Sequence, residues 1–149
     1  MYLDSAIIVK LLVREADSDW FGHRLSGHSF GSSELAMLEV CRALLFKERA
    51  GDIVPDERVQ ALEKFFLLVK NEIILLYPLN REVLKRAHSI LLACHPHVPL
   101  RSLDALHVAT CDLNRCSIMA ATDRRIRAAC KQLGINLIPG ESEDISATK

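Results

Sequence analysis

The sequence predicts an α/β domain whose central sheet is mainly parallel. Short apolar runs of strand length alternate along the chain with longer segments that have the apolar spacing of helices. This alternation is typical of strands joined by helical crossovers. Half of the 149 residues are apolar, which is enough to bury one core without disulfides. We therefore expect a single compact domain over residues 1–139 and a flexible tail over residues 140–149.

The first half of the chain is expected to begin with a strand. Residues 1–3 form this strand and lead into Asp4, after which residues 5–15 have helical apolar spacing. A second short helix follows at residues 17–25 and a brief extended piece at residues 27–31. Two longer helices come next, the first from Ser32 or Ser33 to about Ala50 and the second over residues 55–69. Gly51 is suited to end the first long helix, and Pro55 is suited to begin the second.

The second half is expected to hold three further strands. A β-branched, apolar run over residues 72–77 predicts a buried strand that Pro78 ends. Short apolar runs at residues 117–122 and 135–138 predict the other two strands. The helices between them are expected from Asn80 to Ala93, from Ser102 as N-cap to Cys111, and from Asp123 to Gly134.

The composition favours a cytoplasmic protein. Lys and Arg together number 19, as do Asp and Glu, so the net charge indicates neither a nucleic acid nor a membrane as partner. No apolar run approaches the roughly 20 residues of a membrane span, and no signal-like segment is apparent. The five cysteines are odd in number and lack C-x-x-C spacing, which is typical of free thiols in a reducing compartment.

Two aspartates stand where parallel strands are expected to end. Asp4 follows the first strand, Asp123 follows the strand over residues 117–122, and each precedes a helix. Open parallel sheets bind ligands beyond the carboxyl ends of their strands. We therefore expect both carboxylates on one rim of the sheet.

Two further acids lie on predicted helices. Asp104 is on a largely apolar helix, where the alternative to a functional role is stabilisation of the helix dipole in the first turn. Glu39 has the apolar neighbours Leu35, Ala43 and Phe46 one and two turns away, so this face of the helix is expected to point inward at least partly. The alternative is an ion pair between Glu39 and Arg42 on a half-exposed face. Glu34, in the first turn of the same helix, is a secondary candidate.

The four acids predict a metal centre if their helices reach the rim. Crowded carboxylates cannot all stay ionised without large pKa shifts, and a hard divalent cation resolves this conflict. Ligand sets made only of oxygen suit Mg²⁺ or Mn²⁺. Such ions polarise a phosphate and activate a bound water, so phosphodiester hydrolysis is the expected chemistry.

Two other clusters contain metal-binding residue types. The run CHPHVP at residues 94–99 has Cys and His residues, but its two prolines favour an ordinary loop over a zinc site. Asp104, His107 and Cys111 share one helical stripe, which is compatible with a softer transition metal. We favour His107 as a core histidine bonded to the backbone, and Cys111 as an apolar filler.

The chain resembles the PIN-domain nucleases in four blocks. These blocks are MYLDSAIIVKLLVRE, SSELAMLEVCRAL, LRSLDALHVATC and ATDRRIRAACKQLG, and their order and spacing are most similar to those of the VapC-type toxins of toxin–antitoxin pairs. The resemblance spans nearly the whole chain. It implies a PIN-like three-layer α/β/α fold and a Mg²⁺-dependent endoribonuclease. It also implies a homodimer and a small VapB-type antitoxin protein that holds the enzyme inactive.

The resemblance assigns a role to each acid. Asp4 and Asp104 match the first and third acids of the PIN-domain pattern and would be the firmest metal ligands. Glu39 and Asp123 match the second and fourth acids, and would complete the site or hold a metal-bound water.

Two positions depart from the usual PIN-domain pattern. A hydroxyl residue usually stands one and two positions after the first acid; Ser5 fits, but Ala6 does not, which removes one expected hydrogen bond around the site. Thr122 directly precedes the fourth acid, where relatives often place the threonine one position earlier. Neither departure removes a carboxylate.

Other functions remain open at this point. An aspartyl-phosphate phosphatase would need a second acid two residues after Asp4, where this chain has Ala6, and a receiver domain would need an acidic pair near its first strand. A catalytically inactive PIN-like module that binds RNA or protein is the closer alternative, although all four acids are present. The candidates for binding RNA phosphates are Arg101, Arg124, Arg125 and Arg127, for which a solvated helix face is the alternative.

Overall fold

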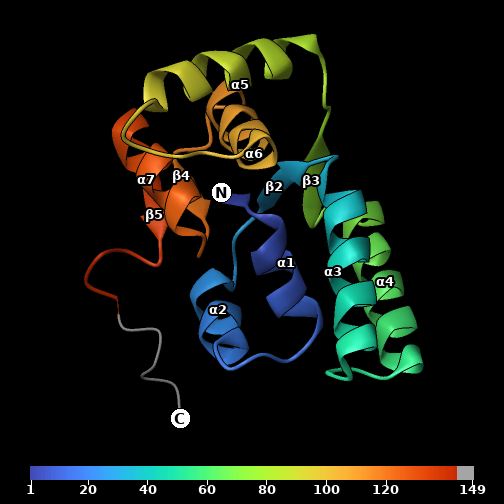
Figure 1. The fold of residues 1–149 in the computed structure, drawn as a ribbon. Coiled ribbons are helices and arrows are strands. Elements are labelled where there is room, and N and C mark those ends of the chain that lie inside the picture. Colours follow the sequence, from blue (N-terminus) through green and yellow to red (C-terminus); the bar gives the residue numbers. More distant parts are fainter. Residues whose placement is uncertain (144–149) are drawn as a thin grey trace.

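A computed structural model describes residues 1–143, in which a five-stranded sheet lies at the centre (Figure 1). The strands are β1 Tyr2–Leu3, β2 Phe30–Ser33, β3 Ile74–Tyr77, β4 Ile118–Ala120 and β5 Asn136–Ile138. They are ordered β3-β2-β1-β4-β5, and every neighbouring pair is parallel. The predicted parallel sheet is therefore confirmed.

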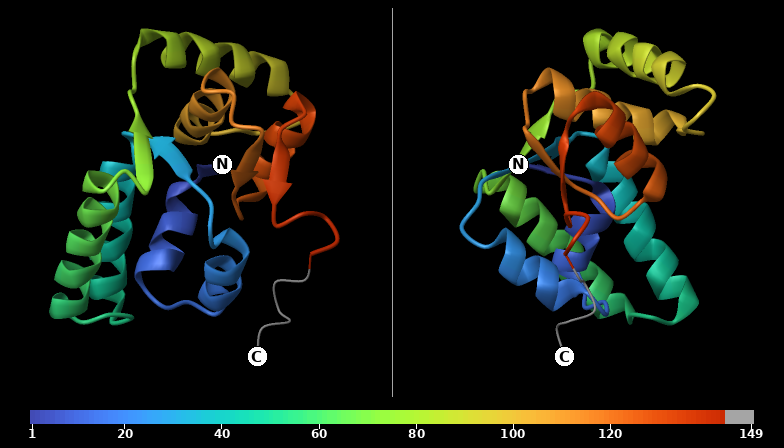
Figure 2. Two further views of the ribbon diagram at one scale, coloured as in Figure 1. Left: turned by 180° about the vertical axis from the view of Figure 1, so that it is seen from behind. Right: turned by 90° about the vertical axis from the view of Figure 1, so that its left-hand side faces the viewer.

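Helices connect the strands and cover both faces of the sheet (Figure 2). They are α1 Ser5–Leu12, α2 Ser18–Leu25, α3 Ala36–Ala50, α4 Pro55–Lys70, α5 Arg81–Cys94, α6 Ser102–Leu113 and α7 Arg124–Leu133. As predicted, α3 and α7 end at glycines, Gly51 and Gly134, whose positive φ angles of 81° and 73° suit this residue type. Over residues 1–143, none of the helices has the length and apolar character that crossing a membrane requires.

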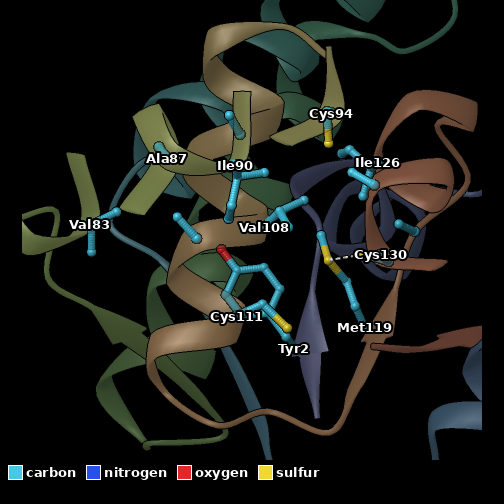
Figure 3. Close-up of a cluster of buried hydrophobic side chains, with 14 residues drawn as sticks. Tyr2, Val83, Ala87, Ile90, Cys94, Val108, Cys111, Met119, Ile126 and Cys130 are labelled. Carbon is cyan, nitrogen blue, oxygen red and sulfur yellow. Dashed lines mark hydrogen bonds between the residues drawn. The ribbon is translucent and has the colours of Figure 1, made fainter. Parts of the chain in front are cut away.

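Alternate side chains of the central strands face two separate cores. Tyr2 of β1 and Met119 of β4 pack in one core with α5, α6 and α7 (Figure 3). The next residues of the same strands, Leu3 and Ala120, pack in the other core with α1 to α4. Because successive side chains of a strand point to opposite faces, the sheet separates two helical layers. The three-layer α/β/α fold is therefore confirmed.

The strand order creates a crevice beside β1. From β1 the chain builds outward to β2 and β3, and then returns to build β4 and β5 on the other side. The carboxyl ends of β1 and β4 therefore flank the point where the strand order reverses, which is where such sheets bind ligands. Asp4 directly follows β1, and Asp123 lies in the short segment between β4 and α7. The two aspartates reach the same rim, as expected.

The second strand starts three residues later than expected, and it contains Ser32 and Ser33, one of which was expected to cap α3. Ser32 Oγ donates a hydrogen bond to the carbonyl of Leu3 at 2.9 Å, and Ser33 Oγ accepts one from the N–H of Leu35 at 3.2 Å. Both serines are buried. Both hydroxyls thus have hydrogen-bond partners, one within the sheet and one at its end. This is why β2 can include residues that are typical of helix caps.

Two other expectations about single elements are wrong. β3 is an edge strand with Leu75 exposed, so it is not the fully buried strand that its apolar composition predicted. Arg101, and not Ser102, is the N-cap of α6, and Ser102 is the first residue of the helix.

The predicted tail is only partly within the described residues. Residues 144–149 lie outside them. In the part that is described, Glu143 accepts a hydrogen bond from the N–H of Gly140 at 2.6 Å and pairs with Arg24 of α2 at 2.8 Å. The domain boundary after residue 139 stays a prediction.

Candidate functional site

All four predicted acids line one cavity of about 680 Å³. Asp4 is at the end of β1, Glu39 is in the first turn of α3, Asp104 is in the first turn of α6, and Asp123 is the N-cap of α7. Each acid is therefore at or near the N-terminus of a helix, where the helix dipole favours negative charge. The fold brings together carboxylates from four separate parts of the chain.

Asp4 is the most enclosed of these acids, with 6% of its surface exposed. Burial raises the pKa of its carboxyl, and the charges of Glu39 and Asp104 act in the same direction, although His107 opposes them. The carboxylates of Asp4, Glu39 and Asp104 are thus electrostatic neighbours whose repulsion favours a cation.

Asp104 is anchored through one oxygen, and Asp123 through both, because Asp123 Oδ2 accepts a hydrogen bond from Arg125 Nη1 at 3.4 Å. Asp104 Oδ2 accepts a hydrogen bond from the backbone N–H of Arg101 at 3.3 Å. Asp123 Oδ1 accepts hydrogen bonds from the N–H groups of Arg125 at 2.7 Å and of Ile126 at 3.3 Å, which caps α7. Burial raises the pKa of Asp104, and the charge of Asp123 adds to this effect. These two acids are therefore neighbours as well.

Glu39 is held by two side chains from other elements. Its Oε2 accepts a hydrogen bond from Ser5 Oγ at 2.6 Å and one from His107 Nε2 at 2.6 Å. Partial burial acts to raise the pKa of Glu39, but the contacts with His107 and then Ser5 hold it below its ordinary value. Glu39 therefore stays ionised in the cavity, and the alternative of an ion pair with Arg42 is not found among the described residues.

His107 links this carboxylate to the core. Its Nδ1 lies 2.7 Å from the hydroxyl of Tyr2, and burial keeps the pKa of Tyr2 well above its ordinary value, so the hydroxyl is protonated. A carboxylate only accepts hydrogen bonds, so Nε2 donates to Glu39, and Nδ1 shares the second hydrogen bond of the ring with the hydroxyl of Tyr2. His107 is buried, as predicted. The expected bond to the backbone is wrong, because its partners are side chains.

The donor set fits a hard divalent cation, but the side chains do not form a complete coordination sphere as they are placed. Within residues 1–143, no three Asp, Glu, His or Cys side chains are close enough to hold a metal ion. One oxygen of Glu39 is bonded to Ser5 and His107, and one of Asp123 to the first turn of α7. The acids nevertheless supply only oxygen donors, which Mg²⁺ and Mn²⁺ prefer. A cation would also relieve the repulsion between them.

The basic residues predicted to bind phosphates lie in different surroundings. Arg101 lines the same cavity as the four acids. Arg124 and Arg125 line a separate hollow beside Asp123, and Arg127 donates a hydrogen bond to the carbonyl of Ala121 at 3.0 Å. Arg101 is therefore the predicted arginine that is best placed to bind a substrate phosphate.

Sequence reasoning missed three other cations of the cavity wall. Lys10 of α1, and Arg42 and Lys47 of α3, line the cavity with the acids. Arg42 was considered only as an ion-pair partner for Glu39. Glu34, the secondary candidate, is not among the cavity-lining residues, and its Oε2 accepts a hydrogen bond from the N–H of Leu79 at 3.0 Å.

The five cysteines are free thiols, as predicted. Cys94, Cys111 and Cys130 are buried in the core between the sheet and α5 to α7 (Figure 3). Cys111 is therefore the apolar filler that its helical position predicted.

In the absence of divalent ions, Asp4→Asn is expected to raise the melting temperature at neutral pH. A raised pKa means that the folded state holds this proton more tightly than the unfolded chain, in which the pKa of Asp is about 3.9. Folding stability is therefore lost as the pH rises above that value, and the loss is complete above the raised pKa.

Thermal melts of both proteins in EDTA, from acid to neutral pH, measure this effect. The advantage of the variant should increase as the pH rises. A variant that melts at or below the wild-type temperature at neutral pH would contradict the raised pKa of Asp4.

The parallel sheet and the acidic cavity at its switch point define the class of protein. The PIN domain family matches residues 1–132, so the chain belongs to the PIN-domain family. Ribonuclease VapC46 of Mycobacterium tuberculosis is 38% identical to the chain over 144 residues, which cover 93% of this chain and 95% of that protein. Within the PIN-domain family the chain is thus of the VapC type, which confirms the resemblance seen in its four acidic blocks.

Proposed function

We propose that the protein is a Mg²⁺-dependent endoribonuclease, with Mn²⁺ as a substitute, and that it is the toxin of a toxin–antitoxin pair. The observation that carries this proposal is the presence of Asp4, Glu39, Asp104 and Asp123 in one cavity. The similar protein VapC46 is named a ribonuclease, which supports RNA as the substrate.

The proposed roles of the acids follow from their environments. Asp4 and Asp104 would be the main metal ligands, as the PIN-domain pattern implies, and a cation would offset the burial and the neighbouring charges that raise their pKa values. Asp123 and Glu39 would complete the site or orient the attacking water. A bound Mg²⁺ would polarise the scissile phosphate and lower the pKa of that water. Arg101 would bind a phosphate on the substrate side of the cavity.

The proposed partners follow from the VapC type. A small VapB-type antitoxin would hold the enzyme inactive, and the active form would be a homodimer. We also propose a cytoplasmic location, which the free cysteines support.

The test is a cleavage assay on purified protein from which any antitoxin has been removed. We expect the protein to cut structured RNA with Mg²⁺ or Mn²⁺ and to stop when EDTA is in excess, as read on a denaturing gel. RNA that is bound but not cut with any divalent ion would indicate a catalytically inactive PIN-like module instead. A phosphorylated Asp4 after incubation with a phosphate ester would indicate a phosphatase.

A further inference from the structure

Phe46 is an exposed aromatic side chain in the wall of the acidic cavity. It lies on α3 seven residues after Glu39, which places it two turns further along the same face of the helix. Both side chains line the same cavity. The apolar spacing around Glu39 predicted that this face would pack inward, but 59% of the surface of Phe46 is exposed. An aromatic ring is therefore presented to whatever enters the cavity.

The cations around Phe46 fall into two groups. Lys47 pairs with Glu15 at 2.8 Å, and Lys10 pairs with the same carboxylate at 2.7 Å. Arg42, one turn before Phe46, also lines the cavity and is exposed, and it makes no ion pair within residues 1–143. Arg101 likewise lines the cavity and makes no ion pair within those residues.

The wall next to Phe46 therefore carries positive charge that no ion pair within residues 1–143 engages. This charge complements a phosphate backbone.

We propose that Phe46 is a stacking platform for an unpaired base of the RNA substrate, and that Arg42 binds a phosphate of the same strand. This inference rests on the proposed ribonuclease function and adds a substrate class to it, single-stranded RNA at this wall of the cavity. Phe46 is about 10 Å along the helix axis from Glu39, given a rise of 1.5 Å per residue. The stacked base thus belongs to a nucleotide near the scissile phosphate.

Unpaired bases suit this wall for a physical reason. The bases of a duplex are already stacked and paired, whereas those of single strands and loops can turn a face toward an aromatic side chain. Every base has such a face, so stacking on Phe46 binds RNA with little sequence preference. Leu103 of α6 is a second exposed apolar side chain in the cavity, and it adds to the apolar surface that a base can cover.

Binding of a short, fluorescein-labelled oligouridylate to the full-length protein, measured by anisotropy in EDTA, tests the proposal without any cleavage. Phe46→Leu is expected to weaken this binding about tenfold, and Phe46→Trp to preserve it, because base stacking contributes strongly to single-strand affinity. RNA should also quench the tryptophan fluorescence of Phe46→Trp more than it quenches that of the wild type, in which Trp20 is the tryptophan. An abasic oligonucleotide should not do so. A blunt duplex should bind the wild type and Phe46→Leu equally.

Phe66→Leu is the matched control. Phe66 is a half-exposed aromatic residue of α4, 47% exposed, that lines a different hollow with Val59 and Leu67. Its replacement should leave oligouridylate binding unchanged, and circular dichroism should show that both variants are folded. Arg42→Gln should weaken binding and reduce its dependence on salt.

The outcomes separate the stacking proposal from the proposed function. Unchanged affinity in Phe46→Leu, with RNA cleavage intact, would overturn the stacking proposal alone. Equal losses in Phe46→Leu and Phe66→Leu would also overturn it. A wild type that neither binds nor cuts RNA would overturn the proposed function and the stacking proposal together.

Discussion

Asp104→Asn and Asp4→Asn are each expected to lower the rate of RNA cleavage by at least about 100-fold while the protein stays folded. Each change keeps the shape of the side chain but removes a charge that a divalent cation would need. Burial and the charges of neighbouring acids raise the pKa of both carboxyls, so a cation bound between them would relieve this repulsion. The rate is measured on a labelled RNA in Mg²⁺ under single-turnover conditions.

Asp112→Asn provides a matched control for Asp104→Asn. Asp112 lies on the same helix, α6, but it pairs with Arg86 at 2.7 Å outside the acidic cavity. Its replacement should leave cleavage unchanged. Mg²⁺ should also raise the melting temperatures of the wild type and of Asp112→Asn. The increase for Asp104→Asn should be much smaller. Cleavage at near the wild-type rate in Asp104→Asn would remove this residue from the proposed metal site.

The positions of Asp4 and Asp123 could be predicted because they depend on local order along the chain. Each follows a short apolar run and precedes a helix, and the parallel topology brings such positions to one rim. Glu39 and Asp104 are on helices, where spacing shows the face of a side chain but not what that face meets. Their presence in the cavity needed the resemblance in the sequence, and the structure then placed them there.

The errors of the sequence analysis have a common physical cause. Ser32 and Ser33 have the residue type of helix caps, yet they lie in β2 because the fold supplies partners for their hydroxyls. Phe46 has the spacing of a core residue, yet it is exposed because the cavity lies at that face of α3. Local pattern cannot reveal a partner or a cavity that tertiary structure creates.

His107 is the clearest case of such a tertiary partner. It is 105 positions from Tyr2 and 68 positions from Glu39 in the chain, and it bonds to both. Helical spacing could compare it only with Asp104 and Cys111, its neighbours on α6. The hydrogen bonds make His107 a positioning residue that fixes Glu39 at the wall of the cavity.

His107→Leu is expected to lower the cleavage rate by about 10- to 100-fold, the range seen when a group that orients a metal ligand is lost. Glu39 would keep its bond to Ser5 but lose its bond to the core. The same change should lower the free energy of unfolding by about 1–2 kcal/mol, because the buried hydroxyl of Tyr2 loses its partner. Single-turnover cleavage and urea unfolding measure the two effects.

The double variant Tyr2→Phe/His107→Leu separates positioning from stability. Replacing both members of a buried hydrogen bond by apolar groups is close to neutral, so the free energy of unfolding should recover toward the wild-type value. Cleavage should stay low, because neither phenylalanine nor leucine can donate a hydrogen bond to Glu39. If cleavage recovered together with stability, His107 would act only through the core, and Glu39 would be positioned by Ser5 alone. Low cleavage in a double variant of restored stability would show that the loss of activity does not come from a weakened core, as expected if the bond from His107 orients Glu39.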